Sequence, residues 1–355
     1  MNTESAVTDI LIQLLRTRSI SGHTEEAMRI IEGRFKELGL ETVLTRKGSL
    51  LATLKGGISA GIVLSAHMDT LGGMISGIEE GCGKISLRSI GSYTMPSIEG
   101  EYCRIETFSG KLFNATVLFD STSVHAHGME DASAKRKKKD MYLRLDEEIS
   151  TGEDVRKLGI SVGNYIHFDP RPILTESGFI KSRHLDDKAG VAILLKTAEY
   201  LVSREIIPSH TLHFLITGYE EVGHGAAGFL PDDLTEFIAV DMGVAGPGRE
   251  SSEDKVTICA ADSTGPFNYL LTKELIEVAS KQSIPYAVDT FPHYGSDAAA
   301  ALRAGLDVRH ALIGPGIDSS HAMERTHVKA LRATIDLIVA YVSDDVPLES
   351  LILLK

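Results

Sequence analysis

Five short segments of this sequence place a carboxylate or an imidazole where an apolar run ends. They are spread over much of the chain, and they are His67-Met68-Asp69, Asp186-Asp187, Glu220-Glu221, Asp241 and His321. Carboxylate oxygens and imidazole nitrogens suit zinc, cobalt or manganese, and an ion with an open coordination position can carry water. The set therefore predicts a hydrolase with a centre of two divalent metal ions that activate a shared water.

Such a centre needs a bridging carboxylate, a general base and a group that orients the imidazole, and the sequence offers a candidate for each role. A shared site needs a carboxylate between the two ions, and Asp186 is the candidate. One of Glu220 and Glu221 can bind metal while its neighbour faces the water as general base, because adjacent side chains point in different directions. Asp69 lies two residues beyond His67 on the same side of an extended segment, where it could orient the imidazole.

An alternation of helices and strands is expected to position these residues. Helices are predicted at 7–15, 25–38, 188–203, 267–281, 296–304 and 326–342, and strands at 50–54, 61–66, 211–217, 236–240 and 307–313. This order is typical of an α/β fold, whose open sheet binds ligands at the carboxyl ends of its strands. His67, Glu220 and Asp241 each follow a predicted strand closely, so the positions agree with the chemistry.

A stretch with a different sequence pattern separates His67-Met68-Asp69 from Asp186-Asp187. From about Leu71 to Thr175, short segments alternate with Gly, Ser, Asn and Pro, which indicates a small β-barrel or sandwich. His125 and His127 would share one face of a strand there, but no third metal ligand is evident nearby. We therefore expect two domains, a catalytic domain of residues 1–70 and 176–355 and an inserted β domain of residues 71–175.

The composition disfavours nucleic-acid-binding and membrane proteins. A net charge of −13 on 355 residues disfavours binding to nucleic acid or to anionic membranes. The basic run Lys135–Lys139 is flanked by acids and is interpreted as a solvated loop. Apolar runs fall short of the ~20 residues that span a bilayer, and no signal peptide is evident. Three widely spaced cysteines favour a reducing compartment, so we expect a cytoplasmic protein.

Three alternatives compete with the metal hypothesis or modify it. A serine or cysteine nucleophile is disfavoured, because no Gly-x-Ser-x-Gly elbow and no recognisable cysteine motif is present. The same metal site could serve an N-acyl amino acid deacylase or amidohydrolase, which assays of aminoacyl and N-acylated substrates would distinguish. A non-catalytic oligomeric scaffold is the third alternative, but a scaffold has no physical need for a complete ligand set.

In order and spacing, these segments resemble the tetrahedral (glutamyl, deblocking) aminopeptidases of metallopeptidase family forty-two. The resemblance covers essentially the whole chain, and its motifs are His67-Met68-Asp69, the β insertion, Leu185–Gly190, Glu220–Gly223, Asp241, Gly295–Ala298 and His321. It implies a phosphorylase/hydrolase-like catalytic domain with a mixed central sheet, interrupted by a small PDZ-like β-barrel. The implied activity is a metallo-aminopeptidase that hydrolyses N-terminal residues from peptides.

The resemblance also implies a role for each site residue. His67 and Asp241 would hold one ion, Glu221 and His321 the other, Asp186 would bridge them, Glu220 would be the base, and Asp69 would support His67. The ions would be zinc or cobalt, with manganese as a further option. The implied partners are peptide substrates and copies of the chain itself, in large shells that are often of twelve subunits, with the β insertion used in assembly.

One loop departs from the usual pattern of that family. His293-Tyr294 precede Gly295-Ser296-Asp297, where a glycine- or arginine-containing stretch is more usual. Because this loop is expected near the site, the departure bears on the substrate side chain that the enzyme prefers.

Overall fold

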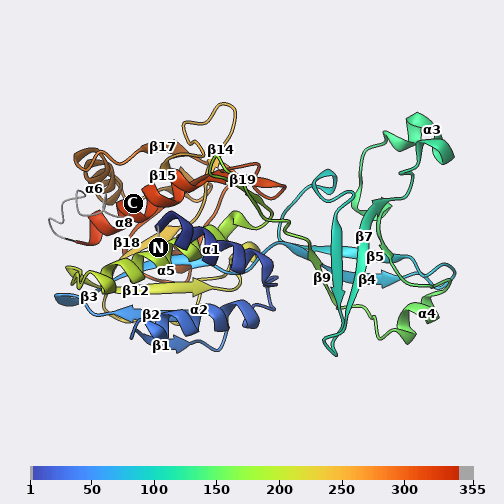
Figure 1. Ribbon diagram of the computed structural model, residues 1–355, viewed down its shortest axis with the longest axis horizontal. Coiled ribbons are helices and arrows are strands. Elements are labelled where there is room, and N and C mark those ends of the chain that lie inside the picture. Colours follow the sequence, from blue (N-terminus) through green and yellow to red (C-terminus); the bar gives the residue numbers. More distant parts are fainter. Residues whose placement is uncertain (1–2, 344–355) are drawn as a thin grey trace. The chain divides into compact units, whose positions relative to one another are not determined.

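The chain leaves one folded unit after Thr70 and returns to it at Arg171 (Figure 1). In this computed structural model, which describes residues 3–343, the first unit comprises Met1–Thr70 and Arg171–Lys355 and contains a large mixed sheet. The second unit, Leu71–Pro170, contains a closed barrel. We refer to them as the sheet unit and the barrel unit.

The sheet unit is built on a 13-stranded sheet. Its main path runs β1 (Glu41–Leu44), β2 (Leu50–Leu54), β12 (His210–Thr217), β3 (Ile58–His67), β13 (Leu234–Val240), β18 (Arg309–Asp318), β19 (Glu324–His327), β11 (Phe179–Ser182) and β10 (Ile173–Leu174). Off this path lie β14 (Gly243–Ala245), β15 (Val256–Asp262), β16 (Gly265–Pro266) and β17 (Tyr286–Thr290). The central strands β12, β3, β13 and β18 are parallel to one another. Antiparallel pairs flank them, because β2 pairs with β1 and β12, and β18 pairs with β15 and β19.

Helices cover both faces of this sheet. One apolar core joins alternate strand residues such as Ile62, Leu64 and Ala66 of β3 to the helices on one face. These helices are α1 (Thr3–Arg16), α2 (Glu25–Glu37), α5 (Leu185–Ser203), α6 (Tyr269–Lys281) and α8 (Val328–Val342). The intervening residue Val63 belongs to a second core, which includes Ala298 of α7 (Asp297–Arg303). Burial on both faces explains why the central strands are continuous apolar runs.

The barrel unit closes six antiparallel strands around its own core. The strands are β4 (Gly72–Ile78), β5 (Ile85–Ile90), β6 (Tyr102–Glu106), β7 (Leu112–Phe119), β8 (Met141–Leu145) and β9 (Tyr165–Phe168). Two short helices, α3 (Val124–Ala132) and α4 (Gly152–Lys157), lie in its connections. Alternate residues such as Ile85 and Leu87 point into the core, as the two-residue period of a half-buried strand requires.

The predicted fold class, an α/β unit with a mixed sheet interrupted by a small β-barrel, is confirmed. The placement of His125 and His127 on a strand is wrong, because both residues lie in α3. The chain bends within α3 at Gly128, whose φ is +81°. Because His125 and His127 lie in a helix, their two-residue spacing does not place them on one face of a strand. Among residues 3–343, no helix has the length and apolar character needed to cross a bilayer.

Candidate metal centre and substrate pocket

The predicted metal segments meet at one edge of the central sheet. Because β12, β3, β13 and β18 are parallel neighbours, their carboxyl ends lie at the same edge. His67 is the last residue of β3, Asp241 follows β13 directly, and the Glu220-Glu221 pair follows β12. His321 lies in the loop after β18, and Asp186 lies at the start of α5. The structure thus brings all the candidate ligands into one region.

Two glycines let the backbone close tightly around these ligands. At Gly314 in β18, a Cβ atom would stand 1.6 Å from the main-chain oxygen of Asp241. At Gly190 in α5, a Cβ atom would stand 2.3 Å from the main-chain oxygen of Val240 and 2.4 Å from the Asp187 carboxylate. Any side chain at either position would therefore push a ligand-bearing segment away from its neighbour.

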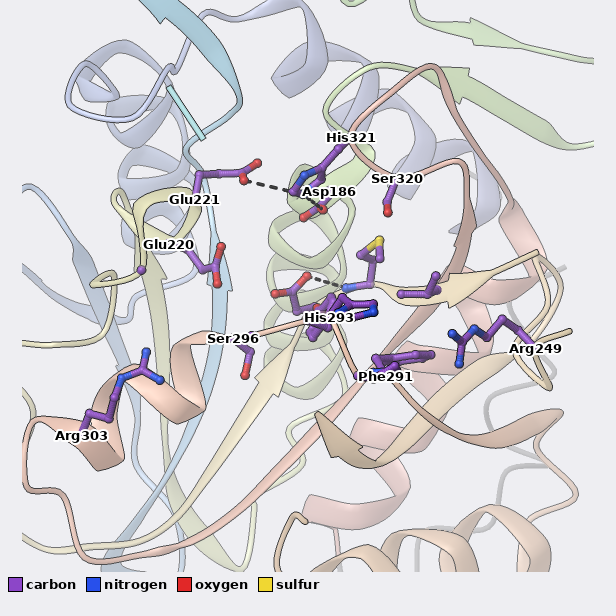
Figure 2. A pocket seen from close by; sticks show the side chains of 17 residues that line it. Asp186, Glu220, Glu221, Arg249, Phe291, His293, Ser296, Arg303, Ser320 and His321 are labelled. Atoms are coloured by element: carbon purple, nitrogen blue, oxygen red, sulfur yellow. Dashed lines mark hydrogen bonds and ion pairs between the residues drawn. The ribbon is translucent and has the colours of Figure 1, made fainter. Parts of the chain in front are cut away.

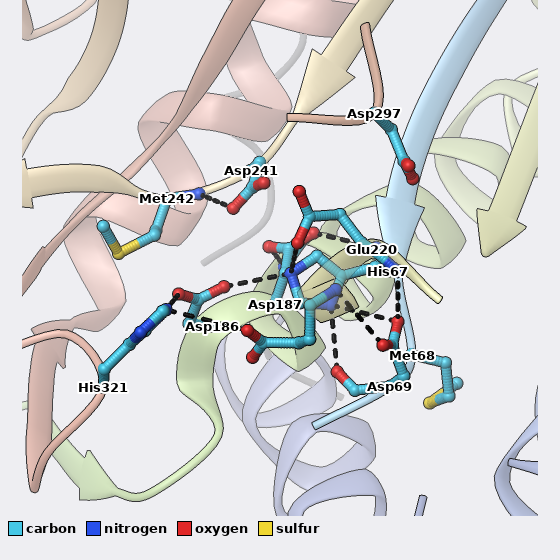
Figure 3. A network of polar contacts seen from close by, with 12 residues as sticks. His67, Met68, Asp69, Asp186, Asp187, Glu220, Asp241, Met242, Asp297 and His321 are labelled. Atoms are coloured by element: carbon cyan, nitrogen blue, oxygen red, sulfur yellow. Dashed lines mark hydrogen bonds and ion pairs between the residues drawn. The ribbon is translucent and has the colours of Figure 1, made fainter. Parts of the chain in front are cut away.

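Asp186 lies between two groups of candidate metal-binding side chains (Figure 3). Its Oδ1 is 3.0 Å from Nε2 of His67, and its Oδ2 is 3.3 Å from Nε2 of His321. Asp241 completes the group with His67, and Glu221 completes the group with His321. Within each group the ligand atoms lie within 4.8 Å of one another. One carboxylate therefore serves both groups, with one oxygen facing each histidine.

Glu220 lies next to the His67 group but is a member of neither group. Its Oε2 is 3.7 Å from Nε2 of His67, whereas Oε2 of Glu221 is 3.7 Å from Nε2 of His321. The short 3-10 turn Glu220–Val222, which ends at Gly223 with φ +85°, gives the two neighbouring acids these different directions. Glu221 thus belongs to a candidate ligand group, whereas Glu220 belongs to neither group.

The carboxylate of Asp69 holds the Glu220-Glu221 turn. It accepts hydrogen bonds from the main-chain amides of Glu220 at 3.0 Å and Glu221 at 3.3 Å, and from the Ser21 hydroxyl at 2.5 Å. The His67 ring instead bonds through Nδ1 to the main-chain carbonyl of Asp69, at 2.9 Å. Nε2 is the ring nitrogen that faces Asp186, 3.0 Å from its Oδ1, and it is the nitrogen that would bind a metal ion in place of a proton.

Glu324 is a supporting residue that the sequence reasoning missed. Its buried carboxylate accepts hydrogen bonds from the main-chain amides of Asp186 and His321, both at 3.1 Å. It therefore fixes the backbone of the shared ligand and of the last ligand together. The available signal was slight, since an acid three residues after His321 resembles an ordinary surface residue.

Two further acids belong to motifs that the sequence analysis named without a role for them. Asp187 is fully buried and accepts a hydrogen bond from the main-chain amide of His67 at 3.1 Å. Asp297 accepts hydrogen bonds from the Thr217 hydroxyl at 2.5 Å and from the Ala226 amide at 2.7 Å. Both acids fix main-chain segments near the site through these hydrogen bonds. The only sequence signal for this role was that each acid lies within one of the named motifs.

Burying these acids together shifts their pKa values. Burial, followed by the charges of neighbouring acids, raises the pKa of Glu220 and of Glu221 well above the ordinary range of a glutamate. Burial and the charge of Asp186 raise the pKa of Asp241 to about 7. Burial also opposes the charged form of Asp186, but hydrogen bonds with His321 and His67 outweigh it and lower its pKa. Such mutual repulsion among buried acids favours the binding of cations.

The donor set fits divalent metal ions. Each group offers imidazole and carboxylate donors, buried in the His67 group and partly buried in the His321 group, a combination that suits zinc, cobalt or manganese. In addition, Oε1 of Glu221 is buried without a hydrogen-bond partner. An unpaired buried carboxylate oxygen is costly, and a bound cation would satisfy it. The residues present can therefore hold divalent metal.

A cavity of about 510 Å³ opens beside the acid cluster (Figure 2). The metal-binding acids and His321 form one side of it, and the loop 291–296 forms another. Arg249 and Phe291 lie close together at its far side, with the guanidinium 6.0 Å from the centre of the ring. A cavity of this volume can take the end of a peptide, since pockets of ~300–1,000 Å³ bind small ligands.

Similarity to known proteins points to the same chemistry. Residues 48–337 match the family model described as M42 glutamyl aminopeptidase. The Bacillus subtilis (strain 168) protein named "Putative aminopeptidase YhfE" is 45% identical over 335 residues, which are 94% of this chain and 96% of that protein.

Solved structures share the fold at low sequence identity. The TET aminopeptidase from the marine sediment archaeon Thaumarchaeota archaeon SCGC AB-539-E09 gives a TM-score of 0.87 at 19% identity and covers 99% of each chain. The TET1 peptidase of Pyrococcus horikoshii gives a TM-score of 0.82 at 21% identity, covering 96% of this chain and 100% of that one. The family match spans every candidate ligand, and the expected enzyme class, a metallo-aminopeptidase, is confirmed. This chain therefore belongs to the M42 glutamyl aminopeptidase family.

Proposed function

We propose that this protein is a di-metal aminopeptidase that removes N-terminal residues from peptides. The observation that carries the proposal is the position of Asp186, which faces a histidine-containing ligand group with each of its two oxygens. His67 and Asp241 would hold one ion, and Glu221 and His321 the other. When bound, two zinc or cobalt ions would polarise the substrate carbonyl and lower the pKa of the attacking water.

Glu220 is the general base of this proposal. Its side chain is 15% exposed and lies beside the His67 group without being needed as a ligand. It would take a proton from the attacking water, hold that proton on its carboxylate, and give it to the amine as the C–N bond breaks. Asp69 supports this role, because its carboxylate fixes the main-chain amide of Glu220 and thereby the direction of the side chain.

The free amine of the substrate would bind among the acids of the site. Asp186, Glu220, Glu221 and Asp241 all line the cavity, so its inner end is strongly acidic. A positively charged amino terminus fits this end, whereas an N-acylated substrate brings no such charge. The site thus favours peptides with a free N-terminus over N-acyl amino acids.

The direct test is an activity panel with defined metals. The full chain, loaded with zinc, cobalt or manganese, would be assayed on aminoacyl-nitroanilides and on N-acetyl amino acids side by side. Cleavage of the aminoacyl substrates with close to two ions per chain would support the proposal. Cleavage of the N-acetyl substrates alone would favour a deacylase, and less than one ion per chain after supplementation would favour a scaffold.

We also propose that copies of this chain assemble, with the barrel unit as an assembly surface. The TET1 peptidase of Pyrococcus horikoshii can assemble into a tetrahedron or a large octahedral shell. The barrel unit here exposes large apolar side chains, among them Tyr102, Phe108 and Met129, which are 66%, 79% and 68% exposed. Light scattering of the full chain and of a Phe108→Ser variant would test this, and a monomer at all concentrations would contradict it.

A further inference from the structure

The loop 291–296 contains two buried hydroxyl groups that have no hydrogen-bond partner. They belong to Tyr294 and Ser296, and both residues line the cavity beside the acid cluster. In Figure 2, Ser296 lies on the same side of the cavity as Glu220. Buried polar groups are nearly always hydrogen-bonded, so an unpaired hydroxyl next to reactive carboxylates indicates a group whose partner is a ligand.

Packing holds the ring of Tyr294 in place. The ring lies 5.6 Å from that of Phe291 at an angle of 56°, and it contacts apolar residues of both cores of the sheet unit. Its main-chain carbonyl accepts hydrogen bonds from the Ser263 amide at 3.0 Å and from the Ser263 hydroxyl at 2.6 Å. With backbone and ring both held, the position of the hydroxyl is determined by the fold.

The hydroxyl of Tyr294 lies at the reacting end of the cavity. Tyr294 lines this cavity together with Asp186, Glu220 and Asp241, and the carboxylate of Asp241 is the neighbour of its hydroxyl. It therefore lies near the shared ligand and near the proposed base at once. A neutral donor at this place is well positioned for negative charge that develops on a substrate.

We propose that Tyr294 is a further catalytic residue, whose hydroxyl donates a hydrogen bond to the scissile carbonyl oxygen as that oxygen becomes negatively charged. The inference rests on the proposed aminopeptidase function. A donor that meets the charged oxygen better than the neutral one lowers the barrier without tightening substrate binding.

Protons and electrons balance in this step. The oxygen of the water forms a bond to the carbonyl carbon, the carbonyl π electrons move onto the carbonyl oxygen, and Glu220 takes the proton of the water. Tyr294 keeps its own proton throughout. When the electron pair re-forms the C=O bond, the C–N bond breaks and Glu220 gives its proton to the leaving amine.

The test compares Tyr294→Phe with the matched control Tyr286→Phe. The hydroxyl of Tyr286 lies on β17, 3.0 Å from that of Ser280 and outside the cavity, so its loss removes one hydroxyl elsewhere in the same unit. For Tyr294→Phe we expect kcat to fall about 100-fold, with KM and metal content unchanged. Its affinity for an α-aminophosphonate analogue, which mimics the tetrahedral state, should fall by a similar factor, while its affinity for the free amino acid stays the same.

Two results would overturn the assignment. If Tyr294→Phe turns over and binds the phosphonate as the unmodified enzyme does, the hydroxyl has no part in catalysis. If metal affinity falls together with kcat, Tyr294 is a positioning residue for Asp241 and not a catalytic one. Failure of the proposed function is a separate result, because it appears in the unmodified enzyme as an absence of aminoacyl-nitroanilide cleavage. In that case the role assigned to Tyr294 is wrong together with the proposed function.

Discussion

The carboxylate of Asp69 accepts a hydrogen bond from the main-chain amide of Glu220 at 3.0 Å, although 151 residues separate the two in the sequence. The same carboxylate accepts a hydrogen bond from the amide of Glu221 at 3.3 Å. Asp69 is fully buried, and it lies just beyond the end of β3, whereas the two glutamates follow β12. The end of one strand thus fixes the turn after its neighbour, and with it the relative positions of the proposed base and a candidate metal ligand.

Changing Asp69 to Asn tests this relationship. The amide of Asn has one acceptor oxygen and a donor nitrogen, so it cannot accept from both main-chain amides as the carboxylate does. We expect kcat to fall about 10–100-fold, as for other residues that support ligands. The unfolding free energy should fall by about 1–3 kcal/mol.

Ser21→Ala serves as the control for Asp69→Asn, because it removes only the 2.5 Å hydrogen bond from the Ser21 hydroxyl to Asp69. A smaller loss of activity is expected there, measured with the same substrate and the same urea titration. If Asp69→Asn kept the activity of the unmodified enzyme, the hydrogen bonds from Asp69 to the Glu220-Glu221 turn would not be needed for catalysis.

Changing Glu220 to Gln should separate catalysis from metal binding. The shape of the side chain is kept, and the hydrogen bond to Asp69 comes from the main chain, so the turn should stay in place. Without a proton acceptor, kcat should fall at least about 1,000-fold, within the usual contribution of a general base. Metal content, measured by mass spectrometry of the purified protein, should not change.

Glu221→Gln is the matched comparison, since it changes the neighbouring acid by the same chemical step. The neutral side chain is a poorer ligand, so this variant should lose metal as well as activity. If Glu220→Gln remained active while Glu221→Gln kept its metal, the two roles would be assigned the wrong way round.

The gathering of the candidate ligands could be predicted from sequence because their positions follow from strand ends. His67 and Asp241 come directly at the end of apolar runs, and parallel strands bring such ends together. The contacts of Asp69 and Glu324 could not be predicted in the same way. Both bond to main-chain amides of distant segments, and the approach of those segments depends on loop geometry that no local pattern encodes.

Secondary structure was least predictable where elements are short. His125 and His127 have the two-residue spacing of a strand face, yet a spacing seen only once is equally compatible with the helix that the structure has there. Two strands of the sheet unit, β15 and β17, were not predicted either. Their pairing with each other and with β18 stabilises them, and that pairing is a tertiary effect.

Changing Asp186 to Asn should remove both metal ions at once. Each of its two oxygens faces one ligand group, so the loss of its charge weakens both groups together. We expect metal content to fall from two ions per chain towards none, with loss of activity. Asp241→Asn changes a ligand of one group only and should leave about one ion per chain. Equal metal loss in the two variants would argue against a bridging role for Asp186.

Asp336 should make the unfolding free energy depend on pH, independently of the active site. It lies in α8 with its side chain 19% exposed, and Nε of Arg332 is 3.5 Å away. Burial raises its pKa to about 6, and Arg332 only partly offsets this effect. Between its usual pKa near 4 and a pKa near 6, the folded protein holds a proton that the unfolded chain has released. Its contribution to stability therefore falls as the pH rises through this window.

Asp336→Asn removes that pH-dependent cost, because the amide stays neutral at every pH. The variant should gain about 2–3 kcal/mol of unfolding free energy relative to the unmodified protein between pH 4 and pH 8. Urea unfolding at several pH values, with chelator in all samples, measures this difference without the contribution of metal binding. Asp232→Asn, a change at an exposed acid, controls for the loss of one charge. A difference that stays constant from pH 4 to pH 8 would show that Asp336 ionises in the folded protein as easily as in the unfolded chain.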